Sequence, residues 1–241
     1  MDHGPLALGT KALALVLAAL TAGAEAAGAP ASLIAMRAAD PKTFVEVLAH
    51  LGVPAGLEIR QADYRRSSTT GQGWHPDDWT REKLARQPSV PLDDVVSAFN
   101  RGRGDYRATL MQGVVVIRPT RKPAAYLDSK PAFGRMEGQG LDRVAEKIFA
   151  PLDSLLDQPG ARVGSRLSAV GAEVDFGDAL QIAIDARGLS PLDALNRMAA
   201  AAPGHAWIVV TTDDATPRIG RFGFVHRHGA TTTMSVGTPS P

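Results

Sequence analysis

Two stretches of the sequence begin with the same three residues, and together they decide the fold. The first is PLDDVVSAFNRGRGDYRATLMQGVVVI, residues 91–117, and the second is PLDALNRMAAAAPGHAWIVVTTDDATPRIGRFGFV, residues 191–225. Each continues with a helix-like segment of similar length, a glycine that ends it, and two strand-like segments. The same order of elements at two places indicates an internal repeat and predicts two related modules.

The apolar residues of both stretches predict a helix followed by a pair of strands. In the first stretch the apolar positions recur three and four residues apart, on one helical face: Leu92, Val95, Val96 and Phe99. Residues 105–112 then alternate as a strand does, and 114–117 are apolar and β-branched, which is typical of a fully buried strand. In the second stretch Ser190-Pro191 opens the helix, and 205–213 and 218–227 are the strand segments.

Upstream of each stretch the pattern predicts three more elements. In the first half these are an opening strand over 31–38, a helix over 41–51 that Asp40 caps, and a strand over 56–60. The first half therefore follows the order β-α-β-(x)-α-β-β.

The second half repeats that order. It is predicted to contain an opening strand over 132–138, a helix over 141–156 that Pro151 breaks or kinks, and a strand over 179–184.

This order predicts the α+β class: two small two-layer modules, each with its helices on one face of a mixed sheet. The first module covers 31–119 with a polar insertion over 61–88, and the second covers 132–230. A linker over 119–131 joins them, and residues 231–241 are expected to be a disordered tail. The pattern leaves open whether the two modules pack as one unit.

Residues 1–26 have the pattern of a secretory signal peptide. Lys11 precedes an apolar run over 12–20, and small residues follow, with Ala24-Glu25-Ala26 or Ala22-Gly23-Ala24 as the cleavage site. The run is shorter than the roughly 20 residues that cross a bilayer, although an uncleaved anchor remains an alternative. We therefore expect a periplasmic or secreted protein with no membrane span after cleavage.

Composition excludes several kinds of chemistry. The 241 residues contain no cysteine, which rules out disulfides, thiol nucleophiles, cysteine-ligated zinc and iron–sulfur clusters. Lysine and arginine number 26 against 25 acidic residues. Because a nucleic-acid binder gathers an excess of basic residues on one face, this near-neutral balance argues against nucleic acid as a partner.

The segment 31–119, with PLDDVVSAF and GVVVIRP in it, resembles the short N-terminal module of secretins and TonB-dependent receptors. The stretch 179–227 resembles the second half of the same module, and this resemblance implies a duplicated module. No barrel of either kind follows, and the insertion over 61–88 departs from the family's pattern. The resemblance implies a periplasmic protein–protein interaction module.

Two groups of residues are candidates for acid–base or metal chemistry. The first is His75, Asp77 and Asp78 in WHPDDW, where an aspartate could instead cap a short helical turn over 77–86. The second is His226 and His228, which point to one face of a predicted strand. Charged residues near them are equally consistent with the solvated side of an edge strand.

Other signatures of catalysis do not occur in the sequence. The serines lack a GxSxG elbow, and the glycines of GRMEGQG, 134–140, lack the spacing of a phosphate-binding loop. Arg101, Arg103 and Arg107 beside Tyr106 could stack on RNA, but they also suit the solvated end of a helix and the following turn.

Two tryptophans, Trp74 and Trp79, lie in the polar insertion. They either anchor that insertion to the core or form, with His75, a partner-binding surface. We expect an exported, non-enzymatic interaction or scaffold protein of the bacterial cell envelope with no cofactor, whose partners are envelope proteins that add to its strand edges. The alternative is a small periplasmic hydrolase or metal-binding protein that uses His75, Asp77, Asp78, His226 and His228.

Overall fold

The structure is a computed structural model, and it describes residues 29–36, 39–69, 87–149, 163–164, 182–226 and 231–236. The predicted signal peptide lies outside these ranges. In the part of the chain that is described, no helix is long and apolar enough to cross a bilayer.

Helices and strands alternate along the chain. The helices are α2 (Ser32–Ala35), α3 (Pro41–His50), α4 (Gln61–Thr69), α6 (Leu92–Gly102), the short 3-10 helix η3 (Ala125–Asp128), α7 (Leu141–Phe149) and α9 (Pro191–Ala201). The strands are β1 (Ala29–Pro30), β2 (Ala55–Arg60), β3 (Ser89–Val90), β4 (Tyr106–Met111), β5 (Val114–Pro119), β6 (Arg135–Gln139), β7 (Val163–Gly164), β8 (Ile182–Asp185), β9 (His205–Thr211), β10 (Ile219–His226) and β11 (Thr231–Val236).

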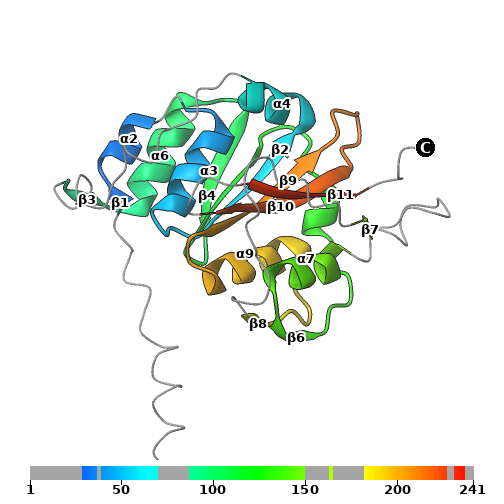
Figure 1. Ribbon diagram of the computed structural model, residues 1–241. Helices are drawn as coiled ribbons and strands as arrows, with labels where there is room; N and C mark the ends of the chain where they lie inside the picture. The colour runs from blue at the N-terminus through cyan, green and yellow to red at the C-terminus, as the bar shows by residue number, and fades with distance from the viewer. Residues whose placement is uncertain are drawn as a thin grey trace, which may run out of the picture.

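A mixed sheet of seven strands forms the centre of the fold (Figure 1), in the order β4-β5-β2-β9-β10-β11-β7. The strand β2 runs parallel to both of its neighbours, β5 and β9, and the other pairs are antiparallel. The predicted α+β class is therefore confirmed. Because β2 belongs to the first half of the chain and β9 to the second, both halves share this one sheet.

The two halves share a small antiparallel pair of strands and a helix that leads into a hairpin, but the predicted β-α-β-(x)-α-β-β order is not kept, because the strand β3 precedes α6 in the first half. In the first half, β1 and β3 pair in a small antiparallel sheet, and α6 leads into the hairpin β4–β5. In the second half, β6 and β8 pair in the same way, and α9 leads into the hairpin β9–β10. Figure 1 shows α7 and α9 lying between the main sheet and the β6–β8 pair.

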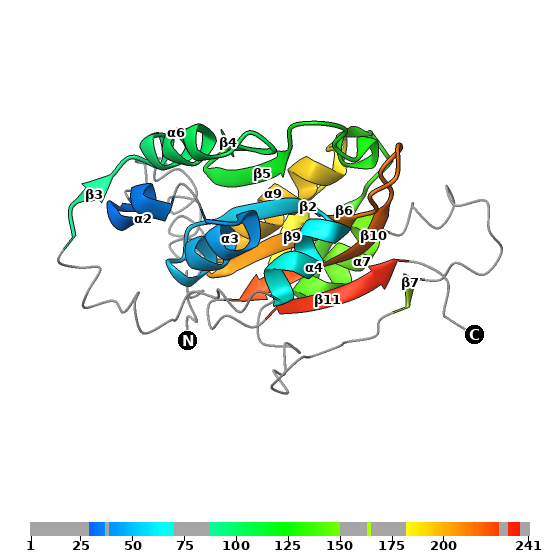
Figure 2. The same ribbon diagram turned by 90° about the horizontal axis from the view of Figure 1, so that it is seen from above.

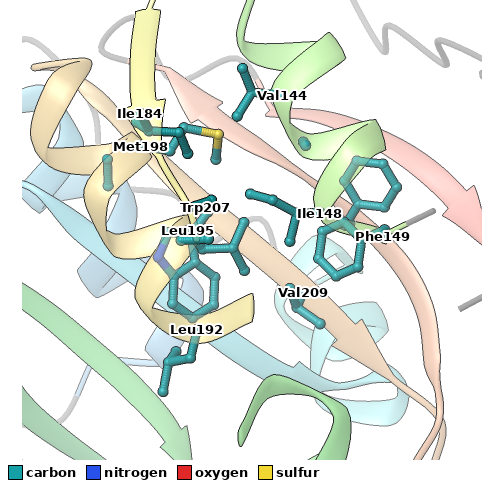
Figure 3. Packing of buried hydrophobic residues seen from close by; sticks show 14 of the residues in the cluster. Val144, Ile148, Phe149, Ile184, Leu192, Leu195, Met198, Trp207 and Val209 are labelled. Carbon is teal, nitrogen blue, oxygen red and sulfur yellow. The ribbon is translucent and has the colours of Figure 1, made fainter. Parts of the chain in front are cut away.

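Helices cover both faces of the main sheet. The core on one face joins α2, α3 and α6 to the inward side chains of β2, β5 and β9. The core on the opposite face joins α7 and α9 to β5, β9 and β10 (Figure 3), where Phe149 of α7 stacks on Phe222 of β10 with ring centroids 4.4 Å apart. Since α3 also packs on β10, and α9 on β2 and β5, each half covers strands of the other.

Two of the predicted elements of the small sheets are corrected by the structure. The prediction of a strand over 31–38 is wrong, because residues 32–35 form the single helical turn α2, whose Leu33 is fully buried beside α6. The strand predicted over 179–184 appears as β8, Ile182–Asp185, but it pairs with β6 and so occupies the position of β3 rather than that of β2. A short apolar run does not by itself distinguish a strand from a helical turn.

Two polar segments also differ from expectation. The predicted insertion over 61–88 begins with an ordered helix, α4, whose Ala62 N–H donates to Asp213. The predicted disordered tail over 231–241 is wrong for 231–236, which form β11 and pair with β10 from Thr231↔Val225 to Ser235↔Arg221. Threonine is β-branched and favours strands, so the polar composition of this segment is compatible with a paired strand.

The start of α3 depends on the Asp40 cap that the sequence predicts. Its carboxylate accepts hydrogen bonds from the backbone N–H groups of Lys42 and Thr43, from the Thr43 hydroxyl, and from the Ser67 hydroxyl of α4. Burial acts to raise the pKa of Asp40, but these hydrogen bonds, those of Thr43 first, bring it below its ordinary value of 3.8. The charged form is thus the one that the fold stabilises.

Replacing Asp40 with alanine is expected to lower the free energy of unfolding by about 1 to 2 kcal/mol at pH 7. Because the folded-state pKa is lowered, this contribution is present above pH 3.8 and is lost as the pH falls through the folded-state value. Urea titrations at pH 7 and pH 3 measure the change. The control is Asp93→Ala, an exposed aspartate in the first turn of α6, with an expected cost under about 0.5 kcal/mol. Equal costs for the two variants would contradict the assignment.

Candidate functional site

Most residues that the sequence singled out for chemistry lie outside the described part of the chain. These are Trp74, His75, Asp77, Asp78, Trp79 and His228. His226 is the last residue of β10, where it is paired with His205 of β9. Burial lowers the pKa of His205. Over the described ranges, no three histidine, aspartate or glutamate side chains gather as a metal site would require.

One concave surface among the described residues lies beside the hairpin β4–β5. Figure 2 shows this hairpin at one border of the main sheet. The concave surface is an open groove with a volume of about 380 Å³. Its lining comes from both strands of the hairpin, the linker that follows, and the first turn of α9: Arg107, Thr109, Met111, Val116, Arg118, Pro119, Thr120, Pro123, Asp128 and Leu192. This volume is within the range of small ligand sites, at its lower end.

The groove forms because β4 lies at the border of the sheet, beyond the strands β2, β5 and β9 on which α9 packs. The side chains of Tyr106 and Ala108 are buried against α6, whereas Arg107 and Thr109 point the other way and are exposed. On that second face, α9 begins at the neighbouring strands, and Leu192 in its first turn contributes to the groove wall. A two-residue turn closes the hairpin, with Gln112 and Gly113 both in the left-handed region at φ 52° and 81°.

A buried ion network fixes the wall formed by the linker. Glu58, fully buried in the middle of β2, accepts a 2.7 Å bond from Nε of Arg118 and a 2.6 Å bond from the backbone N–H of Ala124. The other side of the Arg118 guanidinium makes two bonds to the Asp128 carboxylate, at 2.7 and 2.9 Å. These contacts hold the linker, which the sequence predicts only as a connection, against the sheet.

The two arginines at the groove differ in their partners. Burial raises the pKa of Glu58 and outweighs the opposing hydrogen bond from Arg118. Arg118 is occupied by Glu58 and Asp128, whereas Arg107, its cross-strand neighbour, has no ion pair or hydrogen bond with any residue the structure describes. A solvated cation therefore lies at the rim of a partly apolar groove.

The other arginines that the sequence grouped with Arg107 serve the fold. Arg103 makes two bonds to Asp105 and donates to the Ala39 carbonyl before α3, and Arg101 is exposed in the last turn of α6. Arg107 differs because its strand position aims it into the groove. The alternation of exposed and buried residues along β4 is the sequence signal that one face of this strand is uncovered.

Comparison with known proteins returns no match to a family model, a curated protein or a solved structure.

Proposed function

We propose that this protein is an exported, non-enzymatic interaction protein of the bacterial cell envelope, and that the groove beside β4–β5 receives part of a partner protein. The leader pattern of residues 1–26 supports the location. The resemblance to the N-terminal module of secretins and TonB-dependent receptors supports the class of activity. The observation that carries the proposal is the open groove, with Arg107 at its rim and no ion-pair partner for Arg107 among the described residues.

The lining of this groove suits a protein segment better than a small polar metabolite. Met111, Val116 and Leu192 provide apolar contacts, and Thr109 and Thr120 provide hydroxyl groups near them. Arg107 adds one positive charge that a partner's carboxylate can neutralise. Arginine and apolar anchors of this kind are enriched in protein interfaces. The alternative of a hydrolase or metal-binding protein rests on residues outside the described ranges and stays a prediction.

Site-specific photo-crosslinking tests this proposal. We expect a photoreactive residue at position 109, inside the groove, to link an envelope protein that the same residue at position 97, on the exposed face of α6, does not link. Changing Arg107 to glutamate should reduce the yield of the position-109 product at least fivefold, because it reverses the charge at the rim. Equal products from both positions, or no product from position 109, would count against the groove as the binding surface.

A further inference from the structure

Positive charge is concentrated on the part of the chain that forms most of the groove. Residues 101–130, which include the hairpin β4–β5 and the linker after it, contain seven arginines and lysines against two aspartates. The whole chain contains 26 basic and 25 acidic residues, so the rest of the chain has an excess of acidic residues. A local excess of this kind attracts an anionic partner, even on a protein whose net charge is close to zero.

Both aspartates of residues 101–130 are already paired with arginines. Asp105 lies 3.1 Å from Nε of Arg103, and Asp128 lies 2.7 Å from Arg118. The buried Glu58 of β2 also pairs with Arg118. The segment therefore has no acidic side chain left to neutralise its other basic residues.

Three of those basic residues lie in the groove or next to it in the chain. Arg107 and Thr120 both line the groove, and Arg121 and Lys122 directly follow Thr120. Arg107, Arg121 and Lys122 are exposed, and none of them has an ion pair with a residue that the structure describes. The Arg60 guanidinium donates to the Arg121 carbonyl at 2.5 Å and adds a further cation beside this part of the linker.

The groove has a charged end and an apolar end. Arg107, Thr109 and Met111 line it along β4 and share one face of the strand, because they are two residues apart. Arg107 lies opposite Arg118 of β5, whereas Met111 packs against the apolar cluster that contains Leu192. At about 3.3 Å per residue, the two ends are roughly 13 Å apart along β4. An extended protein segment of about five residues covers this distance.

We propose that the segment received by the groove is extended and acidic, with a carboxylate on Arg107 and an apolar side chain, four residues away, on Met111 and Leu192. This inference rests on the proposed function, since it names the chemistry of the partner at the same groove. An arginine and a carboxylate can form two parallel hydrogen bonds, which makes Arg107 selective for aspartate or glutamate. Side chains four residues apart in an extended segment share one face, as Arg107 and Met111 do. The cations of Arg121 and Lys122 favour further acidic residues beside the first.

An acidic protein segment suits this groove better than nucleic acid, the other common polyanion. Proteins that bind single-stranded nucleic acid combine positive charge with aromatic side chains on which the bases stack. None of the described residues that line the groove is aromatic. Its apolar end, with Met111 and Leu192, offers a contact to an aliphatic side chain and none to a phosphate.

Selection from a displayed library of short random peptides tests the proposal on the full chain. We expect the selected peptides to contain aspartate or glutamate at least three times as often as the library, four residues from a large apolar residue. Thr109→Trp, which fills the middle of the groove, should weaken their binding at least tenfold. Peptides that depend on Thr109 but show no acidic preference would overturn this inference and leave the proposed function standing. Peptides that Thr109→Trp does not affect, or a selection that yields no binding peptide, would contradict both.

A charge reversal tests whether Arg107 recognises the carboxylate. Replacing the acidic residue of a selected peptide with lysine should weaken binding to the unchanged chain at least tenfold, measured by fluorescence anisotropy, and binding to Arg107→Glu less than twofold. Arg101→Glu is the matched control, because it changes the net charge equally but lies in the last turn of α6, away from the groove lining. If Arg101→Glu weakens binding of the acidic peptide as much as Arg107→Glu does, overall charge is the cause and the proposal fails.

The same measurement with a labelled oligothymidylate tests nucleic acid as the occupant. We expect the oligonucleotide to bind at least tenfold more weakly than the acidic peptides, and to bind Arg107→Glu and Arg101→Glu equally. Binding that is tighter than that of the peptides and is lost in Arg107→Glu alone would overturn the proposal in favour of nucleic acid.

Discussion

Replacing Gly56 with alanine is expected to destabilise the protein by about 3 kcal/mol, because the added methyl group has no space. Gly56 in β2 is paired with Trp207 in β9, at the junction of the two halves. A Cβ atom at residue 56 would lie 1.9 Å from Cε2 of Trp207 and 2.2 Å from Cζ2 and Nε1. Contacts below 3.0 Å force a shift of one group or the other.

The indole of Trp207 has little freedom to make that shift. It is 1% exposed, it packs among the side chains of α9 (Figure 3), and its Nε1–H donates to Oδ1 of the buried Asn196 at 3.1 Å. Urea unfolding followed by circular dichroism measures the loss. Gly134→Ala is the control, because a Cβ there meets nothing within 4 Å, and its expected change is within about 0.5 kcal/mol.

A double-mutant cycle shows whether the clash is the cause. Trp207→Leu alone should cost about 3 kcal/mol or more as a large-to-small core substitution. If the methyl group acts through the indole, the double variant Gly56→Ala/Trp207→Leu loses less stability than the sum of the two single variants. Additive losses would mean that alanine at residue 56 destabilises the fold in some other way.

The two helix–hairpin units of this fold could be predicted from sequence, but the way they join could not. The helix–hairpin unit after Pro91 is visible because Leu92, Val95 and Phe99 repeat at helical spacing and the hairpin strands alternate. The same reasoning works after Ser190. These signals lie within one unit, where neighbours in sequence are also neighbours in space.

The junction between β2 and β9 has no such local signal. Ala55–Arg60 looks like a short alternating strand with Glu58 on its polar side, whereas Glu58 is fully buried. Its burial follows from two parallel neighbours, one of them about 150 residues away in the chain, and from the linker that returns across the sheet. The groove is missed for the same reason, since Leu192 and Arg107 meet only after that junction forms.

The network beneath the groove leads to the second large effect. Arg118→Met is expected to lower the free energy of unfolding by about 3 kcal/mol at pH 8, because it leaves the Glu58 carboxylate buried without its cation. The guanidinium itself is 18% exposed, which places the expected loss at the lower end of the range for a broken buried pair. Arg107→Met is the matched control, since Arg107 lies opposite Arg118 on β4, is exposed, and should cost under about 0.5 kcal/mol.

The loss should also depend on pH, in a direction that identifies Glu58 as the cause. Burial already raises the pKa of Glu58 above its ordinary value of 4.5. Below pH 4.5, protonation of Glu58 therefore stabilises the folded state relative to the unfolded state. That contribution is lost as the pH rises through the folded-state pKa. Without Arg118 the pKa rises further, because a hydrogen bond and a charge that both lower it are gone. The difference between Arg118→Met and the unchanged chain should therefore be smaller at pH 5 than at pH 8.

A neutral side chain at residue 58 separates this cause from lost packing. Glutamine can still accept the Ala124 N–H through its amide oxygen but carries no charge to be left unpaired. We expect Glu58→Gln/Arg118→Met to be more stable than Arg118→Met at pH 8 and to lose the pH dependence of that single variant. If the double variant is the less stable of the two at pH 8, the buried charge is not what destabilises Arg118→Met, and the guanidinium acts mainly through its bonds to Asp128. The experiment separates the two explanations because a double variant more stable than Arg118→Met requires an ionised carboxylate inside the sheet, and a less stable one does not.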